Sequence, residues 1–407
     1  MFPVSVFRRC LAPGLLLAVV LTLPAPASAV SESGLRSALA AQMRQAGAAS
    51  SVHVVRVDGD TPIYSLRADR PLIPASVNKL FTTATALNLF GPGERIKTTA
   101  LARVPLDEDG VLKGNLYLKG GGDPSLNATR LGELADALVD AGLTRVNGSV
   151  LGDESLFDQL RGGPNTGGRL DSEIQGQLGA LVTSRGYASR GWQQRPAAVA
   201  ADALRSALVA RKVRVRAKHA GVGTAPEDAT ELAHINSAPM STLIKLTNTP
   251  SDNFYAETLL KLLGATYGES GTTAGGAKVV QGELTDLDIR PTIADGSGLS
   301  RSNRTTSRMV VQLLLTMAGG EHSEPFLDSL AVTGRSGTVQ YRMRTGAAAG
   351  RCQVKTGTLR DVANLAGICR TAGGERVAFS ILMNGIYPST ARTLQDRMVT
   401  SIAGLRG

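Results

Sequence analysis

Apolar runs separated by turn residues predict strands at both ends of the chain. Residues 52–56 and 63–66 flank a Gly-Asp turn and form a predicted strand pair. Near the C-terminus, three further runs predict strands at 352–359, 363–370 and 377–384. We expect one sheet that gathers both chain ends, with helices packed around it, which defines an α+β domain.

Between these ends, apolar surfaces and stop signals predict helices. Residues 79–90 are apolar or Thr-rich all the way round, which indicates a buried helix, and Gly91-Pro92-Gly93 ends it. Further helices are expected in the second half of the chain, at 240–246, 253–263, 305–317 and 390–403.

The section from residue 95 to 235 has a different texture, which predicts an inserted smaller α/β domain. Short strands alternate there with helices, and Gly and polar residues indicate one exposed loop. The expected strands are 115–118 and 145–151, the helices 131–141 and 197–210, and the loop 161–168. The main domain is then discontinuous and consists of residues 30–94 and 236–407.

The chain is basic, with 44 Lys and Arg against 34 Asp and Glu and a formal net charge of +10. Nucleic acid is a disfavoured partner, because aromatic residues make up only 4% of the chain and the basic residues are spread along it. The one dense patch, residues 211–216, alternates Arg with Val, as on the solvent face of a strand. We interpret the positive charge as favouring attraction of the protein to an anionic cell envelope.

Residues 1–29 have the three parts of a secretory signal peptide. Arg8 and Arg9 precede an apolar core, and Ala27-Ser28-Ala29 forms the small-residue cleavage site. An uncleaved membrane anchor is the alternative, but the apolar core is short and interrupted by proline. We expect a protein exported to the periplasm or elsewhere in the cell envelope, with at most peripheral membrane association.

Two cysteines are placed for a possible disulfide. A two-residue turn at Arg360-Asp361 would set Cys352 and Cys369 directly opposite each other in an antiparallel pair. Facing Cα atoms in such a pair lie about 4.5–5.5 Å apart, within disulfide reach. An exported protein meets an oxidising compartment. Two free buried thiols are the alternative, which a longer loop would favour.

Most general catalytic signatures are missing from the sequence. It has no H-E-x-x-H, no Walker A motif and no G-x-S-x-G elbow. The four histidines, His53, His219, His234 and His322, follow no catalytic or metal-binding spacing. We therefore disfavour a Ser-His-Asp hydrolase and expect neither a metal nor a cofactor.

A serine and a lysine at the start of the buried helix indicate a different nucleophile. Ser76 and Lys79 are three residues apart, so their side chains share one face of the helix. A lysine can activate a serine hydroxyl if it loses its proton. Unperturbed, it is neutral in only about one molecule in 2,500 at pH 7, but burial or a second cation lowers its pKa.

Two further motifs follow in order. Ser251-Asp252-Asn253 opens a helix, and Lys355-Thr356-Gly357-Thr358 lies in a strand before a hairpin. Each motif alone has an ordinary explanation, as helix caps or edge-strand residues. Together with Ser76 and Lys79 they match the S-x-x-K, S-D-N and K-T-G set of class A β-lactamases and penicillin-binding proteins.

The chain thus resembles the active-site serine penicillin-recognising enzymes. More closely, it is similar to the D-alanyl-D-alanine carboxypeptidase/endopeptidase family of the penicillin-binding protein 4 type, peptidase family S13. Further family-like stretches cover most of the chain after residue 29 and lie at 114–118, 121–126, 295–300 and 364–367. The resemblance implies a β-lactamase/DD-peptidase-like domain, with an antiparallel sheet flanked by helices, that carries the inserted domain.

The resemblance also implies a role for each motif residue. Ser76 would be the acylated nucleophile and Lys79 its proton acceptor. Ser251 would relay the proton to the leaving amine, and Asn253 would hold the substrate amide.

The third motif would bind the end of the substrate. Lys355 would add positive potential beside the relay serine, and the hydroxyls of Thr356 and Thr358 would bind the terminal carboxylate. Gly357 would let the substrate lie against the strand. Backbone N–H groups of Ser76 and Thr358 would form the oxyanion hole.

The implied activity is that of an exported serine DD-peptidase. It would remove terminal D-Ala from peptidoglycan stem peptides or cut D-Ala cross-links, and β-lactam antibiotics would acylate it. A β-lactamase is the first alternative, but no Glu in this chain has the Asn four residues later that class A enzymes use for deacylation. A non-catalytic wall-binding relative is the second, and the intact motif set counts against it.

The insertion departs from the family pattern. In the family, a long segment between the first two motifs carries two extra domains. Only residues 77–250 separate Ser76 from Ser251 here, so we expect one inserted domain, or one with a vestige of the second.

Overall fold

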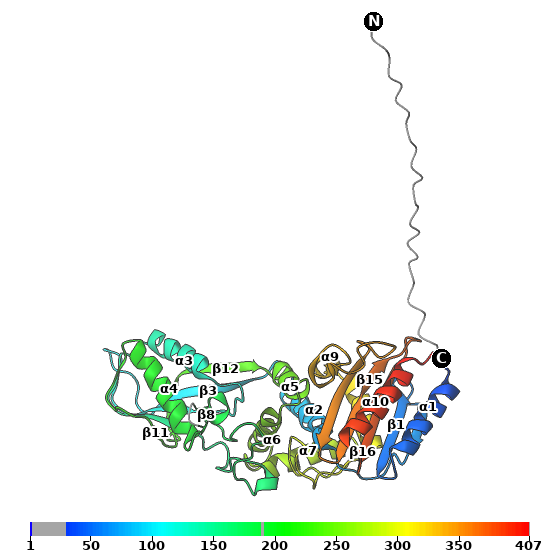
Figure 1. Cartoon of the computed structure of the whole chain (residues 1–407). Coiled ribbons are helices and arrows are strands. Elements are labelled where there is room, and N and C mark those ends of the chain that lie inside the picture. Colours follow the sequence, from blue (N-terminus) through cyan, green and yellow to red (C-terminus); the bar gives the residue numbers. More distant parts are fainter. Residues whose placement is uncertain (2–29, 189–190, 407) are drawn as a thin grey trace.

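The computed structural model describes the whole chain except residues 2–29, 189–190 and 407 (Figure 1). The predicted signal peptide therefore lies, apart from Met1, outside the described residues. Within the described part, no helix combines the length and the apolar character needed to cross a membrane. Both ends of this part meet in the main domain, where Val30 forms a parallel bridge with Leu405.

The main domain is built on one six-stranded antiparallel sheet that combines both chain ends, as the sequence predicts. Its strand order is β13-β14-β15-β16-β1-β2. The N-terminal strands are β1 (Ser50–Arg56) and β2 (Pro62–Leu66). The C-terminal strands are β13 (Ala331–Val332), β14 (Cys352–Leu359), β15 (Val362–Arg370) and β16 (Arg376–Asn384).

Helices cover both faces of this sheet, which explains why its central strands are apolar at nearly every position. Along β15, Leu365 packs into the core beneath α1 and α10, whereas Ala366 packs into the core on the opposite, α8 side. The helices of the first face are α1 (Glu32–Gln45) and α10 (Pro388–Ala403), coloured blue and red in Figure 1.

A layer of helices covers the other face. It comprises α2 (Lys79–Phe90), α5 (Met240–Asn248), α6 (Asn253–Tyr267), α7 (Thr273–Asp286), α8 (Ser307–Gly319) and α9 (Ser323–Asp328). The first two motifs lie at the N-terminal ends of two of these helices, α2 and α6. A short 3-10 turn, η1 (Ala75–Asn78), leads into α2. The predicted helices at 79–90, 240–246, 253–263, 305–317 and 390–403 are all confirmed within a few residues.

The inserted domain lies at one end of an elongated molecule (Figure 1). Its main sheet has the order β11-β7-β5-β3-β12, and α3 and α4 pack together on it over one apolar core. The sheet comprises β3 (Arg95–Ala102), β5 (Leu116–Lys119), β7 (Val150–Asp153), β11 (Gly221–Val222) and β12 (Thr230–Pro239). The helices are α3 (Ala128–Asp140) and α4 (Pro196–Ala210). We propose residues 95–235 as the extent of this domain, as predicted from the sequence; β12, which pairs with β3 along most of its length, continues to Pro239.

The single strand predicted at 145–151 is wrong, because the structure divides it between two sheets. β6 (Arg145–Val146) lies between β4 (Val111–Leu112) and β10 (Arg214–Val215), whereas β7 joins the main inserted sheet. Gly148 lies in the connection, where a Cβ atom would come within 2.4 Å of the Gly114 carbonyl oxygen. Glycine at this position allows the close approach of the two backbones.

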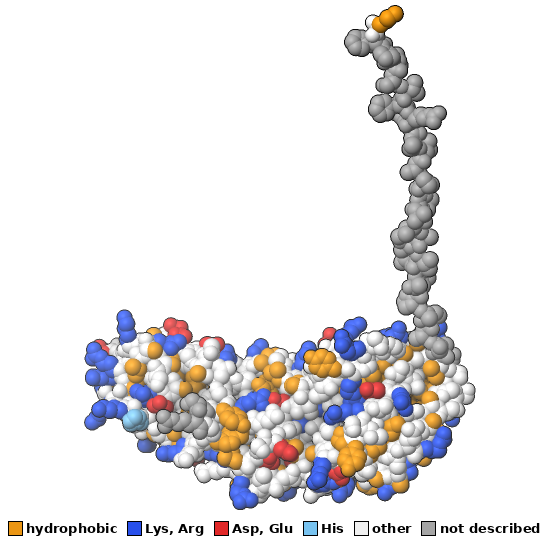
Figure 2. All heavy atoms as spheres, in the orientation of Figure 1, with side chains coloured by type: hydrophobic (Ala, Val, Ile, Leu, Met, Phe, Trp, Pro, Cys, Tyr) orange, Lys and Arg blue, Asp and Glu red, His pale blue; other side chains and the backbone are white. Residues whose placement is uncertain are grey.

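The basic patch at 211–216 faces solvent, as its alternation predicts. Arg214 on β10 is exposed and pairs in parallel register with Arg145, while Val213 is buried. Figure 2 shows Lys and Arg side chains scattered over both domains on the visible face, with a group at the outer end of the inserted domain.

Part of the insertion returns to the main domain instead of packing within its own. Residues 154–186 run back along α6, and Phe157, Ile174 and Leu178 are buried in the core that also contains residues of α2 and α6. A small hairpin, β8 (Tyr187–Ala188) and β9 (Gly191–Trp192), follows this return segment. The exposed loop expected at 161–168 lies within it and is only partly exposed.

The hairpin of β14 and β15 carries the two cysteines opposite each other. Cys352 pairs with Cys369 in the register that a turn at Arg360-Asp361 requires, and their sulfur atoms are bonded at 2.06 Å. The bond lies three residues before Lys355 on the same strand. It therefore ties the strand of the third motif to its neighbour.

We predict that replacing both cysteines by alanine destabilises the main domain by about 3 kcal/mol. The bond closes a loop with a sequence separation of 17, and its loss releases that loop in the unfolded chain. Urea unfolding followed by circular dichroism measures the change, with reduced wild-type protein as control. An unchanged midpoint would contradict a stabilising role.

Candidate active site

The first motif lies where the sheet meets the helical layer. Ser76 sits in η1 and Lys79 is the first residue of α2, with Lys79 Nζ 3.0 Å from Ser76 Oγ. The preceding Ala75 has a φ of 46°, in the left-handed region that a residue with a side chain seldom adopts. Neighbouring parts of the fold hold this turn in place, since η1 packs directly on β14.

Lys79 is fully buried, and three oxygen atoms surround its amine. Nζ lies 3.0 Å from Ser76 Oγ, 2.6 Å from Asn253 Oδ1 and 2.7 Å from the Ser297 carbonyl. Burial lowers the pKa of Lys79 to about 8, against the opposing pull of nearby carboxylates. A neutral amine could still donate to Asn253 and Ser297 while directing its lone pair at Ser76.

The second motif approaches from the junction of α5 and α6. Ser251 has a φ of 64°, so the chain turns sharply before Asp252 caps α6 by accepting a hydrogen bond from the Tyr255 amide. The side chain of Asn253 bridges two segments. Its Oδ1 accepts from Lys79, and its Nδ2 donates to the Glu173 carbonyl at 2.7 Å, which leaves one amide hydrogen for another partner.

The third motif contributes a second buried lysine. Lys355 on β14 is 0% exposed, and its Nζ donates to Ser251 Oγ at 2.7 Å and to the Thr356 carbonyl at 2.9 Å. Burial, with a contribution from the charge of Lys79, lowers the pKa of Lys355 well below its ordinary value. The structure thus forms two serine–lysine pairs, Ser76 with Lys79 and Ser251 with Lys355.

Gly357 has a packing role within the fold itself. A Cβ atom there would come within 2.6 Å of the Pro74 carbonyl oxygen and 3.1 Å of the Ser76 amide nitrogen. The absent side chain therefore lets β14 lie against the turn that carries Ser76. The role in substrate binding that the resemblance implies for Gly357 stays a prediction.

The remaining motif side chains open onto one hollow of about 440 Å³. Ser76, Ser251, Thr356 and Thr358 line it, together with Thr338 and the two arginines 342 and 392. Arg342 is held by Asp396 at 2.7 Å, and Arg392 lies at the start of α10 within 3.5 Å of the Thr358 hydroxyl.

Neither arginine follows from the sequence, because each comes from a segment that only folding brings to the motif strand. No local sequence pattern marks them. The only general expectation is that arginine is common where a protein binds a carboxylate.

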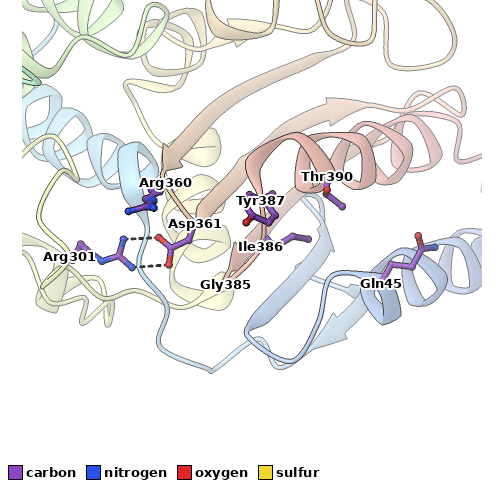
Figure 3. A pocket seen from close by; sticks show the side chains of 8 residues that line it. All are labelled: Gln45, Arg301, Arg360, Asp361, Gly385, Ile386, Tyr387 and Thr390. Carbon is purple, nitrogen blue, oxygen red and sulfur yellow. Dashed lines mark hydrogen bonds and ion pairs between the residues drawn. The ribbon is translucent and has the colours of Figure 1, made fainter.

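A second hollow, of about 840 Å³, lies at the end of the motif strand (Figure 3). The turn residues Arg360 and Asp361 line it, and the start of α10 forms another wall, with Tyr387 exposed. Asp361 accepts two hydrogen bonds from Arg301, at 2.7 and 3.0 Å, drawn as dashed lines in Figure 3. This hollow holds none of the motif side chains.

The return segment of the insertion fastens α6 near the site, which the sequence does not reveal. Arg185 forms an ion pair with Asp252, and its guanidinium lies over the rings of Phe254 and Tyr255 at 5.4 Å from each centroid. Further along α6, the buried Lys261 binds Asp158 at 2.5 Å. Together with the hydrogen bond from Asn253 to the Glu173 carbonyl, these contacts hold the insertion against the start of α6, next to the motif residues.

Taken together, the fold and these two serine–lysine pairs define the class of the protein: a serine hydrolase of the penicillin-recognising type. The model of the D-Ala-D-Ala carboxypeptidase 3 (S13) family matches residues 34–187 and 171–405. The chain therefore belongs to this family, of the penicillin-binding protein 4 type.

Relatives and solved structures agree with the family. A D-alanyl-D-alanine carboxypeptidase from Actinomadura sp. (strain R39) is 28% identical over an alignment 445 positions long, which covers 89% of this chain and 82% of that protein. Carboxypeptidase DacB from Mycolicibacterium smegmatis is 28% identical over 393 residues, 90% and 83% of the two chains. The crystal structure of penicillin binding protein 4 from Haemophilus influenzae has a TM-score of 0.75 at 20% identity and covers 89% of this chain and 98% of its own.

We predict that Gly357→Ala lowers the rate of acylation by a β-lactam about a hundredfold. The added Cβ displaces the turn that carries Ser76, and small displacements of a nucleophile have effects of about this size. Rapid-quench mass spectrometry with benzylpenicillin measures the rate. Gly282→Ala is the matched control, because that exposed helix glycine has open space around its Cβ position and should acylate at the wild-type rate. Equal rates in both variants would contradict the packing role.

Proposed function

We propose that this protein is an exported serine DD-peptidase that acts on the D-Ala-D-Ala ends, and on D-Ala cross-links, of peptidoglycan stem peptides. The observation that carries the proposal is the pairing of Ser76 with a buried Lys79 across from the pairing of Ser251 with Lys355. Both pairs contribute to the hollow through their serines, so a bound peptide would meet both hydroxyls.

The reaction divides into acylation and hydrolysis. Ser76 Oγ attacks the carbonyl carbon of the penultimate D-Ala and gives its proton to Lys79 Nζ. The C–N bond then breaks, and the leaving D-Ala amine takes a proton from the Ser251 hydroxyl, which is restored by the proton that Lys79 had accepted. Water afterwards gives a proton to the neutral Lys79 and attacks the Ser76 ester. The ester C–O bond breaks, the proton passes from Lys79 back to Ser76 Oγ, and the shortened peptide leaves. Backbone N–H groups of Ser76 and Thr358 would bind the developing oxyanion.

Substrate recognition in this proposal depends on the terminal carboxylate. The hydroxyls of Thr356 and Thr358 would donate to it, and Arg392 supplies positive charge beside Thr358. A bound carboxylate would also favour the charged form of the buried Lys355. Asn253 keeps one amide hydrogen for the substrate backbone.

Two features support the finer parts of the proposal. Export is supported by the predicted signal peptide and by the bond between Cys352 and Cys369, since disulfides persist in oxidising compartments. Endopeptidase action is supported by a fold shared with a predatory endopeptidase from Bdellovibrio bacteriovorus, at a TM-score of 0.58 and 20% identity over 87% of this chain and 92% of that one.

We predict that benzylpenicillin forms a stable adduct on Ser76 and that Ser76→Ala abolishes it. The variant removes only the nucleophilic oxygen, so its circular dichroism spectrum should match that of the wild type. Intact-mass and peptide-mapping mass spectrometry locate the adduct, and release of D-Ala from a pentapeptide stem then tests the peptidase. Rapid penicillin hydrolysis without an adduct would identify a β-lactamase. Neither adduct nor hydrolysis in folded protein would favour a non-catalytic wall-binding relative.

We predict that the acylation rate rises with pH through about 8 and then levels off. Lys79 must be neutral to accept the serine proton, and its pKa is lowered to about 8, so the active form accumulates above that pH and is lost below it. Rates measured with benzylpenicillin from pH 5.5 to 10 test this. A profile that is flat across this range would remove Lys79 as the base.

A further inference from the structure

A buried carboxylate that this mechanism does not use lies close to Lys79. Glu257 is 1% exposed and follows Asn253 by four residues on α6, so both side chains project from the same face of the helix. Burial of a carboxylate is costly unless a charge or hydrogen bonds compensate for it. Its presence one turn from the site therefore requires a reason.

A single residue, Ser297, connects Glu257 to Lys79 by hydrogen bonds. Glu257 Oε1 accepts a hydrogen bond of 2.8 Å from the Ser297 N–H, and the Ser297 carbonyl accepts one of 2.7 Å from Lys79 Nζ. Its other oxygen, Oε2, is buried and has no hydrogen-bond partner in the described part of the chain. Helix α6 thus acts on Lys79 twice, directly through Asn253 and indirectly through Glu257.

The turn at 295–300 contains a second buried carboxylate, Asp295. Asp295 holds that turn by accepting from the Gly298 amide at 2.8 Å, the Ser300 amide at 2.5 Å and Asn303 Nδ2 at 2.8 Å. Glu257 accepts from the N–H of Ser297, the residue in contact with Lys79, and hydrogen bonding with the Ser297 side chain and the Gly296 N–H also lowers its pKa. Asp295 thus contacts residues along the whole turn, whereas the contacts of Glu257 centre on the residue that touches the lysine.

The charges around this cluster are few. The charges of Asp295 and Lys79 interact with that of Glu257. Asp252 and Lys355 also interact electrostatically with Lys79, and Lys261 interacts with Glu257. Helix α7 packs on α6 through glycine backbone at 275 and 276. The charged groups of the adjoining helices α5 and α7 are exposed or half-buried: Lys245, Lys278, Glu283 and Asp286.

We propose that Glu257 is a positioning residue for Lys79, which fixes the Ser297 carbonyl against Nζ and adds a negative charge that opposes loss of the ammonium proton. The inference rests on the proposed role of Lys79 as the base. Burial and the neighbouring Asp295 raise the pKa of Glu257 to about 7, so this charge develops as the pH rises through neutrality. Glu257 thereby delays the activation of Lys79 and makes it a stronger base once it is neutral.

The test compares pH profiles of acylation by benzylpenicillin in the full chain. Glu257→Gln keeps an acceptor oxygen for Ser297 but removes the charge, so the rising limb should move about one pH unit lower. Its rate should exceed that of the wild type between about pH 7, where Glu257 gains its charge, and about pH 8, where Lys79 becomes neutral. Its plateau should fall, because a less basic amine accepts a proton less readily. The two profiles should therefore cross.

A second variant and a control complete the experiment. Glu257→Asp keeps the charge but retracts it from Ser297, so the rate should fall at every pH without a shift to lower pH. Glu321→Gln, at an exposed carboxylate, should leave the profile unchanged. If Glu257→Gln does not fold, the Asp variant decides, and a wild-type profile in it would overturn the inference.

The outcomes separate this inference from the function it rests on. A Gln profile that coincides with the wild type, or that changes in height alone, would overturn the role of Glu257 while leaving the peptidase intact. A wild-type protein that forms no adduct would overturn the peptidase, and the role of Glu257 with it.

Discussion

The structure depends above all on the burial of one ammonium group. Lys79 is fully enclosed, and the oxygens around it come from η1, α6 and the turn at 295–300. A buried lysine is tolerated only when oxygen atoms compensate for its lost hydration. These segments, far apart in sequence, must therefore meet at one atom, and the same enclosure lowers the pKa of Lys79 towards neutrality. Stability and reactivity at this site have a common physical origin.

The sheet positions the second half of the site through one strand, β14. Because β14 carries no side chain at Gly357, it can lie against the turn that holds Ser76, and this contact brings Lys355 opposite Ser251. The covalent tie between Cys352 and Cys369 fixes the same strand to β15. Small adjustments of this strand would change the distance between the two serine–lysine pairs.

The insertion makes direct contacts with the main domain beyond the two strands that join them. Its return segment buries apolar side chains in the core of the main domain and pairs Arg185 with the residue that caps α6. The N-terminus of α6, which carries Asn253, is thus held from both sides. Variation in this segment would reach the site without any change in the three motifs.

The sequence by itself determined the elements and the chemistry. Strong periodicity and stop signals located the sheet that unites both chain ends and the helices from 79–90 onwards. The hairpin register placed Cys352 opposite Cys369, and three short motifs predicted Ser76, Lys79, Ser251 and Lys355. Such features are local, because each depends on residues within one helix, strand or turn.

Only the tertiary structure decided what surrounds those residues. Arg342 and Arg392 belong to no motif and reach the site through the packing of distant segments. Glu257 lies one turn after Asn253, but only the fold brings Ser297 to it. The strand predicted at 145–151 is divided between two sheets, and Gly148 in the connection lies close to the Gly114 backbone. The role of Gly357 likewise follows from a neighbour far away in sequence. Contacts between segments are set by the whole fold, which no local pattern records.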